Sequence, residues 1–308
     1  MPFAKTQCRG ILPPFFLVRG MIVGSLALLC LRAGAEEPLV SVVTDAAPQS
    51  PASHGANKIL AALREKGVGA EEVHSLDAAR GKRLIVAGLT GGDGSAAKLL
   101  AKSKPALPRG PEAFSILKSD YLGKPCWVVG GSDDRGLMYA ELDAADRIGW
   151  STDRSDPLSE LRETVEKPAV TSRAVSIYTM NRAYWESRFY DEAYWERYLD
   201  TLAKNRFNSI VVIFGYENGG FLAPCYPYFF DVEGFPDVRM VGIRANEQWR
   251  NLAALNRLIE MSHQRGLELT IGIWDHIYRG GVQGGGLVGA DETTKRPTPG
   301  LVWGVTAD

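Results

Sequence analysis

Polar and charged residues follow three apolar stretches in the second half of the chain, each close after the stretch ends. They are Asn181, Arg182, Glu217, Asn218, Asp275 and His276. Amide, guanidinium and carboxylate groups bind hydroxyl groups, and an arginine can hold a carboxylate through two parallel hydrogen bonds. A histidine beside a carboxylate can move a proton near neutral pH. These residue types predict a site for a ligand rich in hydroxyl or carboxylate groups.

The apolar stretches that precede these residues are typical of parallel strands buried on both faces. They are residues 174–179, 209–214 and 267–273. Helical spacing predicts connecting helices over 190–205 and 246–265, and Gly266 is suited to end the second helix. Alternating strands and helices predict an α/β fold in which the polar strand ends meet at one edge, as at the start of a (β/α)8 barrel.

The first half of the chain predicts a smaller α/β domain over residues 36–150. Its expected strands and helices are strands near 39–43, 83–88, 114–117 and 126–130, and helices over 56–66, 96–102 and 135–148. Residues 151–171 are rich in serine, charged residues and proline, which predicts a linker. The second domain would then cover residues 172–308.

Composition narrows the class of protein. The chain has 308 residues with a net charge of -1, 45% hydrophobic residues and 23% charged residues, which fits a globular protein and gives no basic field for nucleic acid. The spacing of the four cysteines matches no zinc pattern, and we expect no metal and no cofactor. Cys126 and Cys225 lie in different predicted domains, so free buried thiols are expected rather than a disulfide.

The first 35 residues resemble an export signal. Lys5, Arg9 and Arg19 supply positive charge, residues 21–31 are apolar, and residues 33–35 form a small-x-small cleavage motif. The apolar core is shorter than the roughly 20 residues that span a bilayer. We therefore predict cleavage after residue 35, a secreted or periplasmic protein, and no stable membrane span afterwards.

Residues 130–140, with sequence GGSDDRGLMYA, continue to an Arg-Ile-Gly at 147–149. This pattern resembles the last strand and helix of the accessory domain that precedes the barrel in α-glucuronidases of family 67 and β-N-acetylhexosaminidases of family 20. Ser172-Arg173-Ala174 is similar to the arginine-containing start of their first barrel strand. The resemblance covers residues 38 to about 278 in architecture, and it implies an exported glycoside hydrolase with a carbohydrate substrate.

The resemblance transfers no catalytic residue. Glycoside hydrolysis uses two carboxylates that flank the scissile bond. The sequence lacks a hexosaminidase-type Asp-Glu pair, and in the families that it resembles the acid and base lie on later strands. For Glu217 and Asp275 we therefore predict substrate binding rather than catalysis. Arg182 could bind the carboxylate of a uronic acid or form a structural ion pair, and both interpretations stay open. His276 could transfer a proton or be a buried, hydrogen-bonded histidine, and both of these stay open too.

The predicted barrel is incomplete. A (β/α)8 barrel takes roughly 250 residues, whereas three strand–helix units account for residues 172–308. We expect a fragment, inactive by itself, whose catalytic pair lies beyond Asp308. The alternative is a non-catalytic carbohydrate-binding protein with a degenerate barrel. A metal-dependent hydrolase or a lyase is disfavoured, because adjacent residues such as Asp275 and His276 point to opposite faces of a strand.

One long predicted loop, residues 217–245, is rich in aromatic residues. They are Phe221, Tyr226, Tyr228, Phe229, Phe230 and Phe235. Long loops in compact domains are usually functional or part of an interface. The loop therefore predicts either a wall of a polysaccharide cleft or a surface packed against the first domain.

Overall fold

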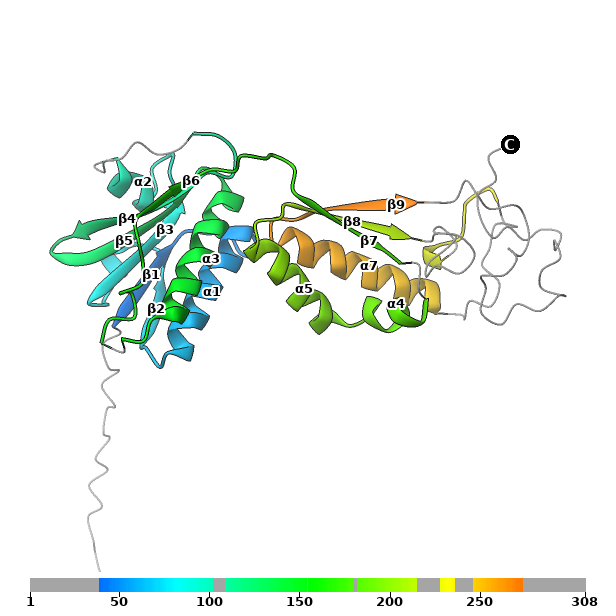
Figure 1. Cartoon of the computed structure of the whole chain (residues 1–308), viewed down its shortest axis with the longest axis horizontal. Coiled ribbons are helices and arrows are strands. Elements are labelled where there is room, and N and C mark those ends of the chain that lie inside the picture. Colours follow the sequence, from blue (N-terminus) through cyan, green and yellow to red (C-terminus); the bar gives the residue numbers. More distant parts are fainter. Residues whose placement is uncertain are drawn as a thin grey trace, which may run out of the picture. The chain divides into compact units, whose positions relative to one another are not determined.

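The computed structural model describes residues 39–101, 109–153, 155–179, 182–214, 228–235 and 246–273 (Figure 1). All of them belong to one compact unit, Glu37–Asp308, which contains two separate sheets. The predicted export signal at residues 1–35 and the residue Cys225 lie outside the described residues. Within the described residues, no helix has the length and apolar character needed to cross a bilayer.

The first sheet has six strands in the order β2-β1-β3-β5-β4-β6. Its elements in chain order are β1 Val40–Thr44, α1 Pro51–Glu65, β2 Ala70–Val73, the 3-10 helix η1 Leu76–Ala78, β3 Arg83–Leu89, α2 Ser95–Leu100, β4 Phe114–Tyr121, β5 Lys124–Gly131, α3 Asp134–Trp150 and β6 Thr164–Glu166. Strands β2, β1, β3 and β5 are parallel, while β4 is antiparallel to both β5 and β6. The α/β prediction is confirmed for this half of the chain.

Helices α1 and α3 cover one face of the first sheet, and α2 lies on the other. The core between the sheet and these helices contains Ile59, Ile85, Val129 and Leu137. A second core on the α2 side includes Cys126, whose thiol is buried and free. Burial, together with the nearby carboxylate of Asp120, raises the pKa of this thiol to about 12, so it is an unreactive packing group.

Capping residues account for where the helices of the first sheet begin. The Asp133 side chain accepts a hydrogen bond from Gly136 N at 2.8 Å and caps α3. The α1 helix begins five residues before the predicted start. There the Ser50 hydroxyl accepts from Ser53 N at 3.1 Å and Pro51 occupies the first turn, where its missing N–H removes no helical bond.

Two short edge strands of the first sheet are not predicted by the sequence. β2 contains two glutamates, and β6 lies inside the predicted linker, where it pairs with β4. Edge strands bury only part of their surface, so they need no apolar alternation. On β2, Glu71 accepts hydrogen bonds from Ser41 Oγ at 2.7 Å and from Arg80 Nη2 at 2.6 Å.

The second sheet is parallel, in the order β7-β8-β9. Its elements are β7 Ala174–Tyr178, α4 Arg182–Phe189, α5 Glu192–Lys204, β8 Ser209–Phe214, α7 Glu247–His263 and β9 Glu268–Ile273. Ile210, Val212 and Phe214 alternate along β8 and pack in a core with residues of α5 and α7. Gly266 follows α7 with φ +67°, the left-handed conformation that ends helices. The three strands confirm the predicted strand positions.

A buried cluster joins the first sheet to the beginning of the second. Its centre is Glu112, which precedes β4 and is 6% exposed. The Glu112 carboxylate accepts hydrogen bonds from Arg135 Nη1 at 2.7 Å, from Asn208 Nδ2 at 2.8 Å, and from Arg173 Nη2. We call Glu112, Arg135, Arg173 and Asn208 the junction cluster. Arg173 and Asn208 stand directly before β7 and β8, so the cluster holds the N-terminal ends of these strands.

Candidate functional site

The C-terminal ends of the second sheet lie at one edge, as predicted. Tyr178 pairs with Ile213, and Phe214 pairs with Ile273, so the three strands end nearly level (Figure 1). The chain leaves each strand toward a predicted site segment. Active sites of α/β proteins lie at such edges, because the loops that follow parallel strands converge there.

The six predicted site residues belong to the segments that follow this edge. Asn181, Glu217, Asn218, Asp275 and His276 lie outside the described residues. Arg182 is the first residue of α4, and its side chain is also outside the description. Their roles therefore stay predictions. Thr179, just before them, is buried, and its N and Oγ1 both donate to Ile213 O at 3.0 Å, which fixes where the chain leaves β7.

Helix α4, which sequence periodicity did not predict, brings aromatic residues to the strand ends. The Trp185 ring stacks with Trp195 of α5 at a centroid distance of 6.3 Å, and Phe189 meets Phe214 of β8 edge to face. The Arg188 guanidinium lies 3.4 Å from the centre of the Tyr184 ring. The contacts of Trp185 and Phe189 hold α4 against α5 and the C-terminal end of β8.

Asn251 is a supporting residue that sequence reasoning missed. It lies on α7 and is 0% exposed. Its Oδ1 accepts a hydrogen bond from the Tyr190 hydroxyl, and its Nδ2 donates to Tyr228 O at 2.9 Å. Tyr228 belongs to the long predicted loop after β8. The signal was present in the sequence, because Asn251 shares one helical face with Leu255 and Leu258.

Replacing Asn251 with leucine is expected to lower the free energy of unfolding by about 1–3 kcal/mol, because the hydrogen bonds that the buried Asn251 amide makes with the Tyr190 hydroxyl and the Tyr228 carbonyl are lost. Urea unfolding measures the change. Asn205→Ala is the matched control, since its amide makes a hydrogen bond to Thr201 O at 2.8 Å in an exposed setting. Equal losses in the two variants would contradict a supporting role for Asn251.

Exposed aromatic side chains gather in the segments next to this edge. In the described part of the chain they are Tyr178, Tyr184, Phe230, Phe235 and Trp249. Trp249 lies in the first turn of α7 and is 73% exposed. Because α7 returns from the strand ends to the start of β9, its first turn lies on the same side as the predicted site segments. The edge thus presents apolar rings to solvent, next to segments that carry polar residues.

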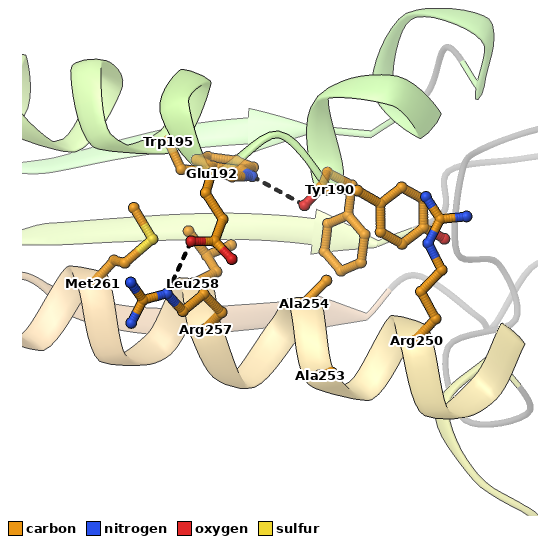
Figure 2. Close-up of a pocket in the computed structure, with 10 residues that line it drawn as sticks. Tyr190, Glu192, Trp195, Arg250, Ala253, Ala254, Arg257, Leu258 and Met261 are labelled. Atoms are coloured by element: carbon orange, nitrogen blue, oxygen red, sulfur yellow. Dashed lines mark hydrogen bonds and ion pairs between the residues drawn. The ribbon is translucent and has the colours of Figure 1, made fainter. Parts of the chain in front are cut away.

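A pocket of about 290 Å³ lies between α5 and α7, on the helix-covered face of the sheet. Figure 2 shows Arg250 beside the Tyr190 ring and Arg257 reaching from α7 to Glu192. The Arg250 guanidinium lies 3.7 Å from the centre of the Tyr190 ring. Arg257 Nε lies 3.3 Å from Glu192 Oε2. The pocket has an aromatic wall and two cations, but its carboxylate is already paired. This arrangement can bind a ligand, and it does not form the pair of acids that general acid–base hydrolysis uses.

Metal ligands do not cluster in the described part of the chain. No group of three or more His, Cys, Asp or Glu side chains there is arranged to hold an ion. The expectation that no metal binds stays a prediction for the strand-end segments.

Comparisons with known proteins identify the fold. No protein-family model matches the chain, and no curated relative does either. Among solved structures, a GH138 enzyme targeting pectin rhamnogalacturonan II matches with 19% identity and a TM-score of 0.53, over 76% of this chain and 24% of that one. The structure of CpGH84D matches with 13% identity and a TM-score of 0.50, over 83% of this chain and 36% of that one.

These identities show the fold alone. The chain spans less than two fifths of the length of either matched structure. The first sheet and the strand–helix units that follow it therefore form an α/β fold that is also found in these larger proteins.

Proposed function

We propose that this chain is the N-terminal part of an exported glycoside hydrolase that acts on polysaccharide or oligosaccharide. Its second sheet would be the first three strands of a (β/α)8 barrel, and its first sheet an accessory domain of the type found in families 20 and 67. Support for this proposal comes from the fold shared with a GH138 enzyme. In this view the catalytic acid and base stand on strands later than β9.

One observation carries the proposal furthest: exposed aromatic rings stand at the edge where parallel strands end. The C–H face of a sugar ring is apolar, and aromatic side chains offer a rigid apolar surface against which it packs. Polar groups placed beside such rings then bind the hydroxyl groups of the sugar. In the proposal Asn181, Arg182, Glu217, Asn218, Asp275 and His276 supply these groups.

The direct test is hydrolysis of a panel of aryl glycosides and oligosaccharides by the full protein. The proposal requires turnover of at least one member. Binding of a sugar without turnover of any would instead support the alternative, a non-catalytic carbohydrate-binding protein.

Trp249→Ala is expected to raise the KM for an oligosaccharide about 5- to 30-fold, because removing an apolar ring contact weakens binding by about 1–2 kcal/mol. Steady-state kinetics on an oligosaccharide and on a short aryl glycoside measure the effect, and kcat for the short substrate should stay unchanged. Leu122→Ala is the control, since Leu122 is an exposed apolar residue in the turn between β4 and β5. An unchanged KM in Trp249→Ala would show that the Trp249 ring does not contact the oligosaccharide.

A further inference from the structure

A second cleft lies between α1, α3 and the C-terminal half of α5. Its volume is about 480 Å³, which falls in the range of small-molecule sites. The α5 helix returns toward the N-terminal ends of the strands, so this cleft is remote from the predicted strand-end site. Neither the proposed hydrolysis nor the predicted site residues account for it.

The cleft has one aromatic wall. Trp150, the last residue of α3, lines it and is 65% exposed. Most tryptophans are largely buried, because the indole ring gains the most of any side chain from leaving water. The lining also includes three small side chains, those of Ala61, Ala62 and Ala145. They leave room for a flat ring to lie against the indole.

The aspartates of the cleft are paired with cations. Lys58 Nζ lies 2.6 Å from Asp200 Oδ2, and Arg265 Nε donates to Asp200 Oδ1 at 2.6 Å. Lys204 Nζ lies 2.6 Å from Asp146 Oδ1. An ammonium has three donor protons and a carboxylate accepts about four hydrogen bonds, so each paired group keeps unused hydrogen-bonding capacity. Burial and the nearby Arg265 lower the pKa of His54 to about 4, so this residue adds no charge at neutral pH.

Two further groups can bind a hydroxyl. The Thr201 hydroxyl donates to Arg197 O at 2.8 Å, and its oxygen can still accept. Glu65 makes no ion pair with any residue that the structure describes. The lining therefore offers donors and acceptors in alternation without a strong net charge. A sugar hydroxyl both donates and accepts, whereas a highly charged ligand would have to displace one of the ion pairs.

We propose that this cleft is a carbohydrate-binding site that holds one neutral sugar unit of a polysaccharide against Trp150. Hydroxyl groups of the sugar bind the paired lysines and aspartates, Thr201 and Glu65. The site does not depend on hydrolysis, and it would hold a polymer on the protein at a distance from the strand ends.

Native affinity electrophoresis of the full protein tests the proposal. The gels contain neutral galactan, arabinoxylan or dextran, or acidic polygalacturonate. We expect retardation by at least one neutral polymer, with an apparent affinity that falls about 10-fold or more in Trp150→Ala and is largely kept in Trp150→Phe. The reduction corresponds to about 1.4 kcal/mol. Retardation by polygalacturonate alone, or none in any gel, would overturn the proposal.

Leu122→Ala is the control, because it removes an exposed apolar side chain from the turn between β4 and β5, outside both the second cleft and the strand-end site. It should keep the retardation that Trp150→Ala loses. If Trp249→Ala abolishes retardation while Trp150→Ala does not, the polymer is held at the strand ends and the second cleft is not a sugar site. Thermal unfolding of the alanine variants shows that each is folded. Because the readout is binding, its outcome is separate from the turnover that tests the proposed hydrolase.

Discussion

Replacing Glu112 with glutamine is expected to lower the free energy of unfolding by about 3 kcal/mol, because removing one partner of a buried ion pair leaves the other charge uncompensated. Glutamine keeps the size of the side chain but not its charge. Arg173 and Arg135 are only 19% and 25% exposed, so water replaces little of what they lose. Urea unfolding at neutral pH, with the m-value compared between proteins, measures the change.

The control for Glu112 is Glu192→Gln, which breaks the exposed pair between Glu192 and Arg257. Exposed pairs contribute less than about 1 kcal/mol. If the two glutamine variants lose the same stability, the junction cluster is no more important than a surface ion pair.

The contribution of Glu112 also depends on pH. Burial acts to raise the pKa of its carboxyl, but hydrogen bonds from Asn208, Arg173 and Arg135 outweigh burial and hold the pKa below the ordinary 4.5. A lowered folded-state pKa gives stability that is present above the unfolded-state pKa and is lost as the pH falls through the folded-state pKa. The difference between wild type and Glu112→Gln should therefore shrink as the pH falls below about 4.5.

The opposite result is expected at Glu141, where substitution with methionine should raise the free energy of unfolding. Glu141 lies on α3 facing α1 and is 0% exposed. Neither of its carboxyl oxygens has a hydrogen-bond partner among the described residues. A Cβ at Gly55 of α1 would lie 2.2 Å from Glu141 Oε2, so a glycine is required opposite the carboxyl. Methionine fills similar space without an unsatisfied polar group, and the expected gain is about 1–3 kcal/mol.

The pH dependence at Glu141 has the reverse sign. Burial, with a smaller contribution from Asp134, raises the pKa of the Glu141 carboxyl well above 4.5. A raised folded-state pKa means that stability is greatest below the unfolded-state pKa and falls as the pH rises toward the folded-state pKa. The advantage of Glu141→Met should therefore grow as the pH rises above about 4.5.

Glu141→Gln separates charge from polarity at this position. It removes the titration but keeps an amide without partners, so its stability at neutral pH should lie between those of wild type and Glu141→Met. If the stability of wild type rises with pH relative to Glu141→Met, the carboxyl must have a partner in solution that stabilises its ionised form.

How far the sequence predicts the fold depends on what each element buries. Strand β8 is predicted at its observed bounds by its run of apolar residues. The burial expected on both faces is found on one face only, since Ile210, Val212 and Phe214 are buried and the residues between them are partly exposed. Helix α4 was missed because residues 182–189 mix aromatic and charged side chains without helical spacing, and its position depends on contacts with α5 and β8.

The strand-end edge was predictable from the sequence, because polar residues follow each apolar run. The side-chain contacts that support the strands were not predictable. Glu112 binds Arg173 and Asn208 across 61 and 96 positions of sequence, and no local pattern connects residues that far apart. The second cleft likewise brings together three helices that are separate in the chain.

The junction cluster also affects how the protein can be divided. Glu112 holds a left-handed backbone conformation at φ 58°, which residues other than glycine rarely adopt. Its carboxylate serves the beginnings of β7 and β8 at once, while Arg135 Nη2 lies 3.7 Å from Glu268 Oε1 at the beginning of β9. Residues of the first sheet therefore bind the N-terminal ends of all three strands of the second sheet. A protein shortened to begin at residue 171 would contain Arg173 and Asn208 without the Glu112 carboxylate that accepts their hydrogen bonds. We therefore expect the second sheet to be less stable when it is produced without the first.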